Sequence, residues 1–140
     1  MMVLHTSDVF VTLADPDGET LMRFYHLLFG LEPSVHIPRV YTEFRLPGLR
    51  LALFKPQENH AAEFVGRPLQ DLQSSAGGIS LCVEVAELEE AIAQLTTLGC
   101  PPPGEITIAS HGREIYAYDP LGNRLILHEK IILPKNSPPG

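Results

Sequence analysis

The sequence predicts an α+β fold built from two tandem β-α-β-β-β modules, and three observations lead to this prediction. Short segments that alternate between apolar and polar residues outnumber helical patterns in both halves of the 140-residue chain. The order of strand and helix patterns is the same in each half. The motif Gly-x-Arg-Leu-x-Leu occurs at Gly48–Leu53 and again at Gly122–Leu127. Internal self-similarity of this kind indicates two copies of one supersecondary unit.

The first module is predicted to begin with a strand and a helix. Val9–Leu13 alternates and is rich in β-branched and aromatic residues, as strands are. Asp15–Gly18 then supplies N-cap residues and a proline suited to a first helical turn. Apolar residues at helical spacing follow, and Gly30 is expected to end the helix. These apolar residues are Leu21, Phe24, Tyr25 and Leu28.

Three further segments of the first module have strand composition. They are Ser34–Ile37, Val40–Leu46 and Leu49–Lys55. Pro47 and Gly48 stand between the last two segments, and such a two-residue connection is typical of a β-hairpin.

The second module is predicted to repeat this order. Gly78–Val85 is the first strand, and Gly99 ends the helix, whose apolar stripe is Leu88, Ala91, Ile92, Leu95 and Leu98. The remaining strands are Glu105–Ala109, Arg113–Tyr118 and Asn123–Glu129, with a turn at Asp119–Gly122. We therefore expect one domain at residues 1–134. It contains module one at about 8–56, a linker at about 57–77 and module two at about 78–130; residues 135–140 are expected to form a disordered tail.

Composition limits the partners that the chain is expected to have. The net charge is −7, and no stripe of lysine and arginine exists to neutralise phosphates, so we expect no nucleic acid. No apolar run approaches the roughly 20 residues of a membrane span, and no secretion signal opens the chain. Cys82 and Cys100 belong to no CxxC pair, so reduced thiols in a cytoplasmic protein are expected.

Two segments connect the predicted modules to a known family. FYHLLFGLEP (Phe24–Pro33) and YDPLGNRLILHE (Tyr118–Glu129), in this order of elements, resemble the vicinal oxygen chelate superfamily. That group includes glyoxalase I, extradiol dioxygenases, fosfomycin-resistance enzymes and bleomycin-resistance proteins. The resemblance covers Asp8 to Glu129. It implies curled mixed sheets that form a cup, helices on the outer face, and a homodimer.

Alternation along the strands predicts which side chains line such a cup. Leu125 and Leu127, like Ile79, Leu81 and Val83, are expected beneath a helix, so the residues between them face inward. The resemblance adds Glu114, Tyr116 and Tyr118 to the inner face. We predict that ligand-binding residues come from this face. They are Asp8, Tyr41, Glu43, Arg45, Arg50, Phe54, Glu114, Tyr116, Arg124 and His128.

Metal chemistry is not expected at the usual place. The metal ligands of the superfamily align with Asp8, Ala52, Gly78 and Ile126, of which only Asp8 has a donor side chain. One carboxylate does not hold a divalent transition metal against water. We therefore predict no metal and no cofactor. A displaced site remains the alternative, and it would be built from Asp8, Glu43, Glu114 and His128.

Arg50 and Arg124 occupy equivalent places in the repeat, and two interpretations of them stay open. Either arginine suits a ligand carboxylate or phosphate. Alternatively, Arg50 pairs with Glu43 or Glu84, and Arg124 with Glu114 or Asp8.

The leading hypothesis is a metal-independent protein that binds a small organic molecule. The alternatives are a glyoxalase-like or dioxygenase-like enzyme (lyase, isomerase or oxygenase) and a module that acts through protein contacts. No catalytic residue is assigned.

Overall fold

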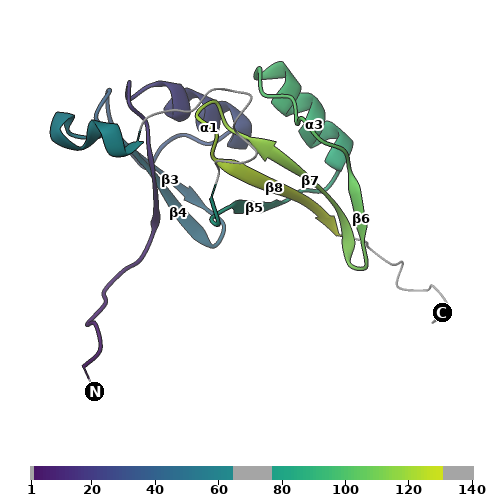
Figure 1. Cartoon of the computed structure of the whole chain (residues 1–140), viewed down its shortest axis with the longest axis horizontal. Coiled ribbons are helices and arrows are strands. Elements are labelled where there is room, and N and C mark those ends of the chain that lie inside the picture. The colour runs from purple at the N-terminus through teal and green to yellow at the C-terminus, as the bar shows by residue number, and fades with distance from the viewer. Residues whose placement is uncertain (1, 65–76, 131–140) are drawn as a thin grey trace. The chain divides into compact units, whose positions relative to one another are not determined.

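The computed structural model describes residues 2–64 and 77–130. The chain divides into two compact units, Met1–Gly66 and Arg67–Gly140. Each unit contains a four-stranded mixed sheet and an α-helix, as Figure 1 shows. The predicted α+β fold with two β-α-β-β-β modules is therefore confirmed. The part of the predicted linker at 65–76 and the predicted tail at 135–140 lie outside the described residues.

The sheet of the first unit has the strand order β1-β4-β3-β2. β1 (Val11–Ala14) pairs in parallel with β4 (Leu49–Phe54), while β3 (Tyr41–Leu46) pairs antiparallel with β4 and with β2 (Val35–Ile37). The β3–β4 hairpin turns at Pro47–Gly48, as predicted. Gly48 has a φ of 77°, a backbone conformation that glycine adopts without steric cost.

Two aspartates hold the first turn of α1 (Thr20–Phe29). Asp17 accepts hydrogen bonds from the backbone N–H groups of Glu19 and Thr20, and its other oxygen accepts the Thr20 hydroxyl. The buried Asp15 accepts the N–H groups of Leu21 and Met22. Four N–H groups without intrahelical partners are thus satisfied by the predicted segment. The N-cap position itself is a correction: it is Glu19, whose side chain makes no capping hydrogen bond, and Pro16 precedes the helix instead of standing in its first turn. The helix ends at Gly30 in the left-handed conformation.

The segment predicted to be a linker begins with regular structure. A 3-10 helix, η1 (Glu58–Phe64), is the next element after β4 in the chain. The ring of Phe64 meets the ring of Phe54 edge to face at a centroid distance of 5.5 Å. The polar composition of this segment predicted only a linker and did not indicate this aromatic contact with β4.

The sheet of the second unit repeats the topology of the first, with the strand order β5-β8-β7-β6. β5 (Leu81–Glu84) pairs in parallel with β8 (Arg124–Lys130), and β7 (Gly112–Tyr118) lies antiparallel between β8 and β6 (Thr107–Ala109). α3 (Leu88–Thr97) packs against β8. The Asp119–Gly122 turn is closed by the Gly122 N–H, which donates to the Asp119 carbonyl.

Hydrogen bonds and ion pairs of side chains connect the start of α3 to β7 and β8. Glu129 accepts the backbone N–H of Leu88 at the start of the helix. Arg113 donates to both oxygens of Glu89 and to both oxygens of Glu129. These carboxylates raise the pKa of Arg113, while the arginine lowers the pKa of Glu89. The helix start and the end of β8 therefore form one linked group.

Most of the predicted face assignment is confirmed by burial. Leu51 and Leu53 of the first sheet are buried, as are Leu125 and Leu127 of the second. Ile79 is a correction, because 78% of this residue is exposed. β5 begins only at Leu81, so Ile79 precedes the strand, and Leu81 and Val83 of the same predicted set are only half-buried. In each sheet, the face opposite the helix is called the open face below.

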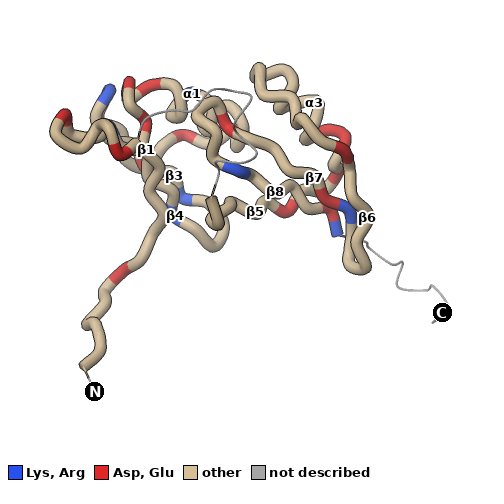
Figure 2. Tube along the Cα trace, in the orientation of Figure 1, with Lys and Arg blue, Asp and Glu red and all other residues tan. Residues whose placement is uncertain are grey.

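Acidic residues outnumber basic ones in the sequence. Figure 2 shows acidic residues distributed along both units, while the basic residues are fewer and include the cross-strand partners Arg45 and Arg50. None of the helices in the described part of the chain has the length and apolar character needed to span a membrane.

Removing the Asp17 carboxylate should weaken the start of α1. Hydrogen bonds from the Thr20 hydroxyl and from backbone N–H groups lower the pKa of Asp17 from 3.8 to about 2. The stabilisation is therefore complete above pH 4 and is lost as the pH falls towards 2. Asp17→Ala should cost about 1 kcal/mol at neutral pH. Asp17→Asn should keep an acceptor oxygen and flatten the acid dependence. Urea unfolding between pH 2 and pH 6 measures both, and an unchanged acid dependence in Asp17→Asn would contradict the assignment.

The two faces of β8 provide a matched pair of substitutions. Leu127 is 2% exposed on the helix side, whereas its neighbour Ile126 lies partly exposed on the open face. Leu127→Ala should destabilise the protein by about 2–5 kcal/mol, and Ile126→Ala should cost distinctly less. Thermal or chemical unfolding compares the two variants, and an inverted order would mean that the face assignment is wrong.

Candidate functional site

Arg50 on the open face of the first sheet is held by groups of its own unit. Its Nη2 lies 2.6 Å from a carboxylate oxygen of Asp8, and its Nε lies 3.7 Å from Glu43. The guanidinium also sits 4.0 Å from the centre of the Phe10 ring, within the range of a cation–π contact. Glu43 is one of the partners expected for Arg50. The charge of this arginine is therefore compensated internally.

Of the other predicted residues of the first sheet, Tyr41 joins this cluster, whereas Arg45 and Phe54 lie apart from it. The Tyr41 hydroxyl donates to Glu43 at 2.6 Å, and burial together with this carboxylate raises the pKa of Tyr41. Arg45 is exposed opposite Arg50 in the register. Phe54 instead lines a separate pocket of about 490 Å³ formed with η1. Its other lining residues are Lys55, Pro56, Gln57, His60, Glu63 and Phe64.

Arg124, the counterpart of Arg50, has different partners. Its Nε donates to the Ser80 hydroxyl at 2.6 Å, and its Nη2 donates to the Gly77 carbonyl at 2.5 Å. Within residues 2–64 and 77–130, no carboxylate lies at salt-bridge distance from Arg124, so neither acidic partner expected for it is found there. The two acceptors that Arg124 does have, the Ser80 hydroxyl and the Gly77 carbonyl, are neutral. The half-buried guanidinium thus keeps its charge uncompensated.

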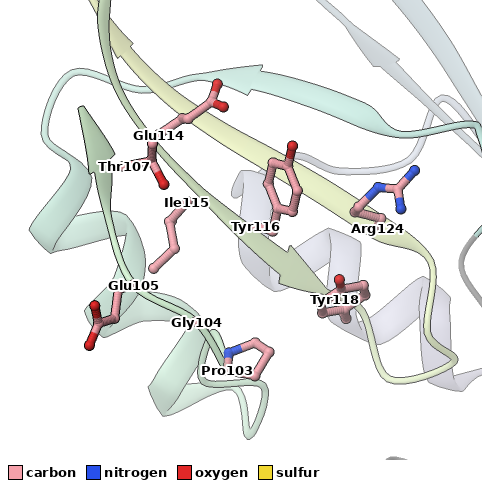
Figure 3. Close-up of a pocket in the computed structure, with 9 residues that line it drawn as sticks. All are labelled: Pro103, Gly104, Glu105, Thr107, Glu114, Ile115, Tyr116, Tyr118 and Arg124. Atoms are coloured by element: carbon pink, nitrogen blue, oxygen red, sulfur yellow. The ribbon is translucent and has the colours of Figure 1, made fainter. Parts of the chain in front are cut away.

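A pocket of about 450 Å³ lies beside Arg124 on the second unit (Figure 3). β7 contributes Tyr116 and Tyr118, which share a face with Arg124 because Tyr118 is its direct cross-strand partner. Tyr118 is buried, whereas Tyr116 is 49% exposed and presents its ring to the pocket. The lining residues are Pro103, Gly104, Glu105, Thr107, Glu114, Ile115, Tyr116, Tyr118 and Arg124. This volume is typical of sites for small molecules.

His128 lies further along β8 in a closed environment. Its Nδ1 donates to Glu84 on β5 at 3.0 Å, and its side chain is only 8% exposed. Its Nε2 is buried and has no hydrogen-bond partner. The ring of His111 lies at a centroid distance of 5.0 Å. His128 shares the open face with its cross-strand partner Glu114, but it does not line the pocket.

Cys82 on β5 is a free cysteine that is largely exposed, and its neighbour on β8 is Ile126. Partial desolvation, and then the carboxylates of Glu84 and Glu114, raise the pKa of its thiol. A raised pKa keeps sulfur in the less reactive thiol form at neutral pH. The geometry therefore gives Cys82 no activation as a nucleophile.

The structure brings three of the predicted binding residues into one pocket: Glu114, Tyr116 and Arg124. It brings Asp8, Tyr41, Glu43 and Arg50 together in a separate cluster. Sequence reasoning missed the segment from Pro103 to Thr107, because the face of that strand was not assigned. The antiparallel pairing of Thr107 with Glu114 would have placed it on the same face.

Comparison with known proteins settles the family. A sequence profile of the glyoxalase/bleomycin resistance protein/dioxygenase superfamily matches residues 5–127. This chain belongs to that superfamily. The resemblance inferred from the two motif segments is confirmed. No curated protein matches the sequence.

Solved structures of other superfamily members share the fold. A glyoxalase-related enzyme from Fulvimarina pelagi has 24% identity and a TM-score of 0.66, with 92% of each chain covered. Lactoylglutathione lyase from Agrobacterium tumefaciens has 23% identity and a TM-score of 0.61, covering 89% of this chain and 94% of that one. A fosfomycin resistance protein from Listeria monocytogenes, solved with Mn(II), has 19% identity and a TM-score of 0.62, covering 91% and 93%. These similarities establish the fold.

The residues at the superfamily's metal positions do not fit a divalent metal. Ala52 is buried and Ile126 is apolar, while Gly78 has no side chain. Asp8 is the one carboxylate, and it is paired with Arg50. Across the described residues, no group of three histidine, cysteine, aspartate or glutamate side chains is arranged to hold a metal ion.

Gly112 should be essential for the closed arrangement around His128. Its φ is 156°, and an added Cβ would lie 2.2 Å from the Glu129 carbonyl oxygen and 3.0 Å from His128 Nε2. Gly112→Ala should destabilise the protein by about 1–3 kcal/mol or more, because the contact is with backbone. Gly78→Ala is the control, since no atom lies within 4 Å of its added Cβ. Urea unfolding of both variants tests this, and equal stabilities would contradict the described packing.

Proposed function

We propose that this protein binds a small organic molecule without a metal ion, as bleomycin-resistance proteins do. The ligand occupies the pocket on the open face of the second sheet, beside Arg124 and Tyr116. A cytoplasmic homodimer belongs to the same proposal, on the basis of the superfamily resemblance.

The observation that supports this proposal is that Arg50 and Arg124 occupy equivalent positions in the repeat but have different partners. Arg50 is neutralised by Asp8 and approached by Glu43, so it contributes to the stability of its own unit. Arg124 donates only to neutral oxygens and borders a pocket that has a half-exposed tyrosine ring in its wall. An uncompensated guanidinium next to apolar surface is suited to an anionic ligand.

The side chains at the superfamily's metal positions support ligand binding rather than metal-assisted chemistry. Three of the four superfamily metal positions have no donor atom, and the fourth carboxylate is engaged by Arg50. Arg50 also lies close to Glu43, a second member of the displaced metal site considered as the alternative. A cation at Asp8 and Glu43 would have to displace a guanidinium that already balances their charge.

The test combines metal analysis with a ligand screen. Protein purified without chelator should hold only substoichiometric metal by elemental mass spectrometry, before and after dialysis against Ni²⁺, Mn²⁺, Zn²⁺ and Fe²⁺. A thermal-shift screen of small aromatic and anionic compounds should then find stabilising ligands. A ligand present at a hundredfold excess over its Kd adds about 2.7 kcal/mol of stability.

Equivalent variants of the two arginines provide the control. Arg124→Ala should weaken binding of the best compound with little loss of stability, because this side chain forms no ion pair within the described residues. Arg50→Ala should lower the melting temperature and leave affinity unchanged, because it leaves Asp8 and Glu43 without their cation. Near-stoichiometric metal retention would overturn the proposal in favour of a metal-dependent enzyme. A screen without any hit would overturn it as well.

A further inference from the structure

The pocket beside Arg124 is electrically polarised. Figure 3 shows the Tyr116 ring between Arg124 and Glu114, while Glu105 lies at a separate place in the lining with its carboxylate turned away from these three residues. The lining thus presents one positive and two negative side chains at separate places, with an aromatic surface in the middle. A ligand that complements this lining has its own charges in the opposite order.

The Arg124 end is suited to one carboxylate. A guanidinium has five N–H donors, and the two hydrogen bonds to Ser80 and Gly77 leave three of them free. Free donors arranged in a planar fork match the two oxygens of a carboxylate. A doubly charged phosphate would match the fork too, but the Glu114 carboxylate across the Tyr116 ring disfavours a high negative charge.

The opposite end is suited to a cation. In the described part of the chain, neither Glu105 nor Glu114 forms an ion pair. Arg113, the arginine next to Glu114 in sequence, points to the other face, where it binds Glu89 and Glu129. The Glu114 carboxylate beside Tyr116 therefore has no cationic partner among the described residues. A protonated amine of the ligand would supply one.

The spacing along β7 sets the size of the ligand. Tyr118 lies opposite Arg124, and Glu114 is four residues before it on the same face. Four residues of strand span about 13 Å. Both side chains are long, and rotation about their bonds lets them reach towards Tyr116, so a ligand of one aromatic ring with a short substituent at each end can contact both.

We infer that the pocket selects zwitterionic aromatic compounds, with a carboxylate bound by Arg124, a flat ring against Tyr116, and a protonated amine bound by Glu114. This inference rests on the proposed binding function and names its ligand class. The uncharged centre gains from contact with the exposed tyrosine ring, while the two charged ends fix the orientation.

The experiment uses 4-(aminomethyl)benzoate and its two half-charged analogues, 4-methylbenzoate and benzylamine. Affinities are measured by NMR titration of the isotope-labelled full chain at low ionic strength. The zwitterion should bind about tenfold more tightly than either analogue, because it satisfies both ends at once. The neutral compound 4-methylbenzyl alcohol should bind most weakly.

Two variants assign the ends of the ligand. Arg124→Gln should weaken binding of the two carboxylates about tenfold and leave benzylamine unchanged. Glu114→Gln should weaken the two amines and leave 4-methylbenzoate unchanged or tighter. Arg124→Lys should recover only part of the loss, since it restores charge without the planar fork. Arg23→Gln, which removes an exposed positive charge from α1, is the control and should change no affinity.

The outcomes separate this inference from the function on which it rests. If 4-methylbenzyl alcohol binds as tightly as the zwitterion, or if both pocket variants leave every affinity unchanged, the inferred ligand class is wrong while small-molecule binding stands. If none of these compounds and no member of the screening library binds, the proposed function is wrong together with the inference. Dispersed amide spectra of each variant establish that an affinity loss is not unfolding.

Discussion

In each sheet, the apolar face on the side of the helix is buried. This burial decides which side chains lie on the open face. Once Leu125 and Leu127 lie in the core, alternation along β8 fixes the face of every other side chain on this strand. A shift by one residue would expose both leucines. Arg124 and His128 therefore reach the open face as a consequence of hydrophobic packing on the opposite one. The parallel pairing of β5 with β8 then brings Glu84 beside His128. The candidate site depends on the core in this direct way.

The fold could be predicted from the sequence because its signals are local and occur twice. Glycines at the helix ends, a Pro-Gly hairpin and an apolar alternation specify each element without reference to distant residues. The partners of Arg50 and Arg124 could not be predicted in the same way. Both arginines occupy the same motif, but Asp8 and Phe10 approach one of them, while Ser80 and Gly77 approach the other. That difference arises from the path of the segments preceding β1 and β5, which the motif does not encode.

The second unit also shows why the pocket was only half predicted. Strand parity indicated its β7 and β8 wall, which includes Tyr116 and Arg124. The remaining wall comes from Pro103 to Thr107, which lies mostly outside regular structure and reaches the site through the pairing of β6 with β7. Short irregular segments have no periodicity from which a face can be assigned. In the first unit, an aromatic contact likewise placed η1 against Phe54 where composition indicated only a linker.

The ion pair between Arg50 and Asp8 has a consequence for how the two halves of this chain can diverge in evolution. Losing either partner alone leaves an unpaired charge, so the two positions are expected to covary among homologues that retain the cluster. Arg124 is under no such pairwise constraint within the described residues, and its substitution pattern should follow the molecule that the protein recognises. A duplicated fold can in this way keep one copy of a motif for its own integrity while the other adapts to new chemistry.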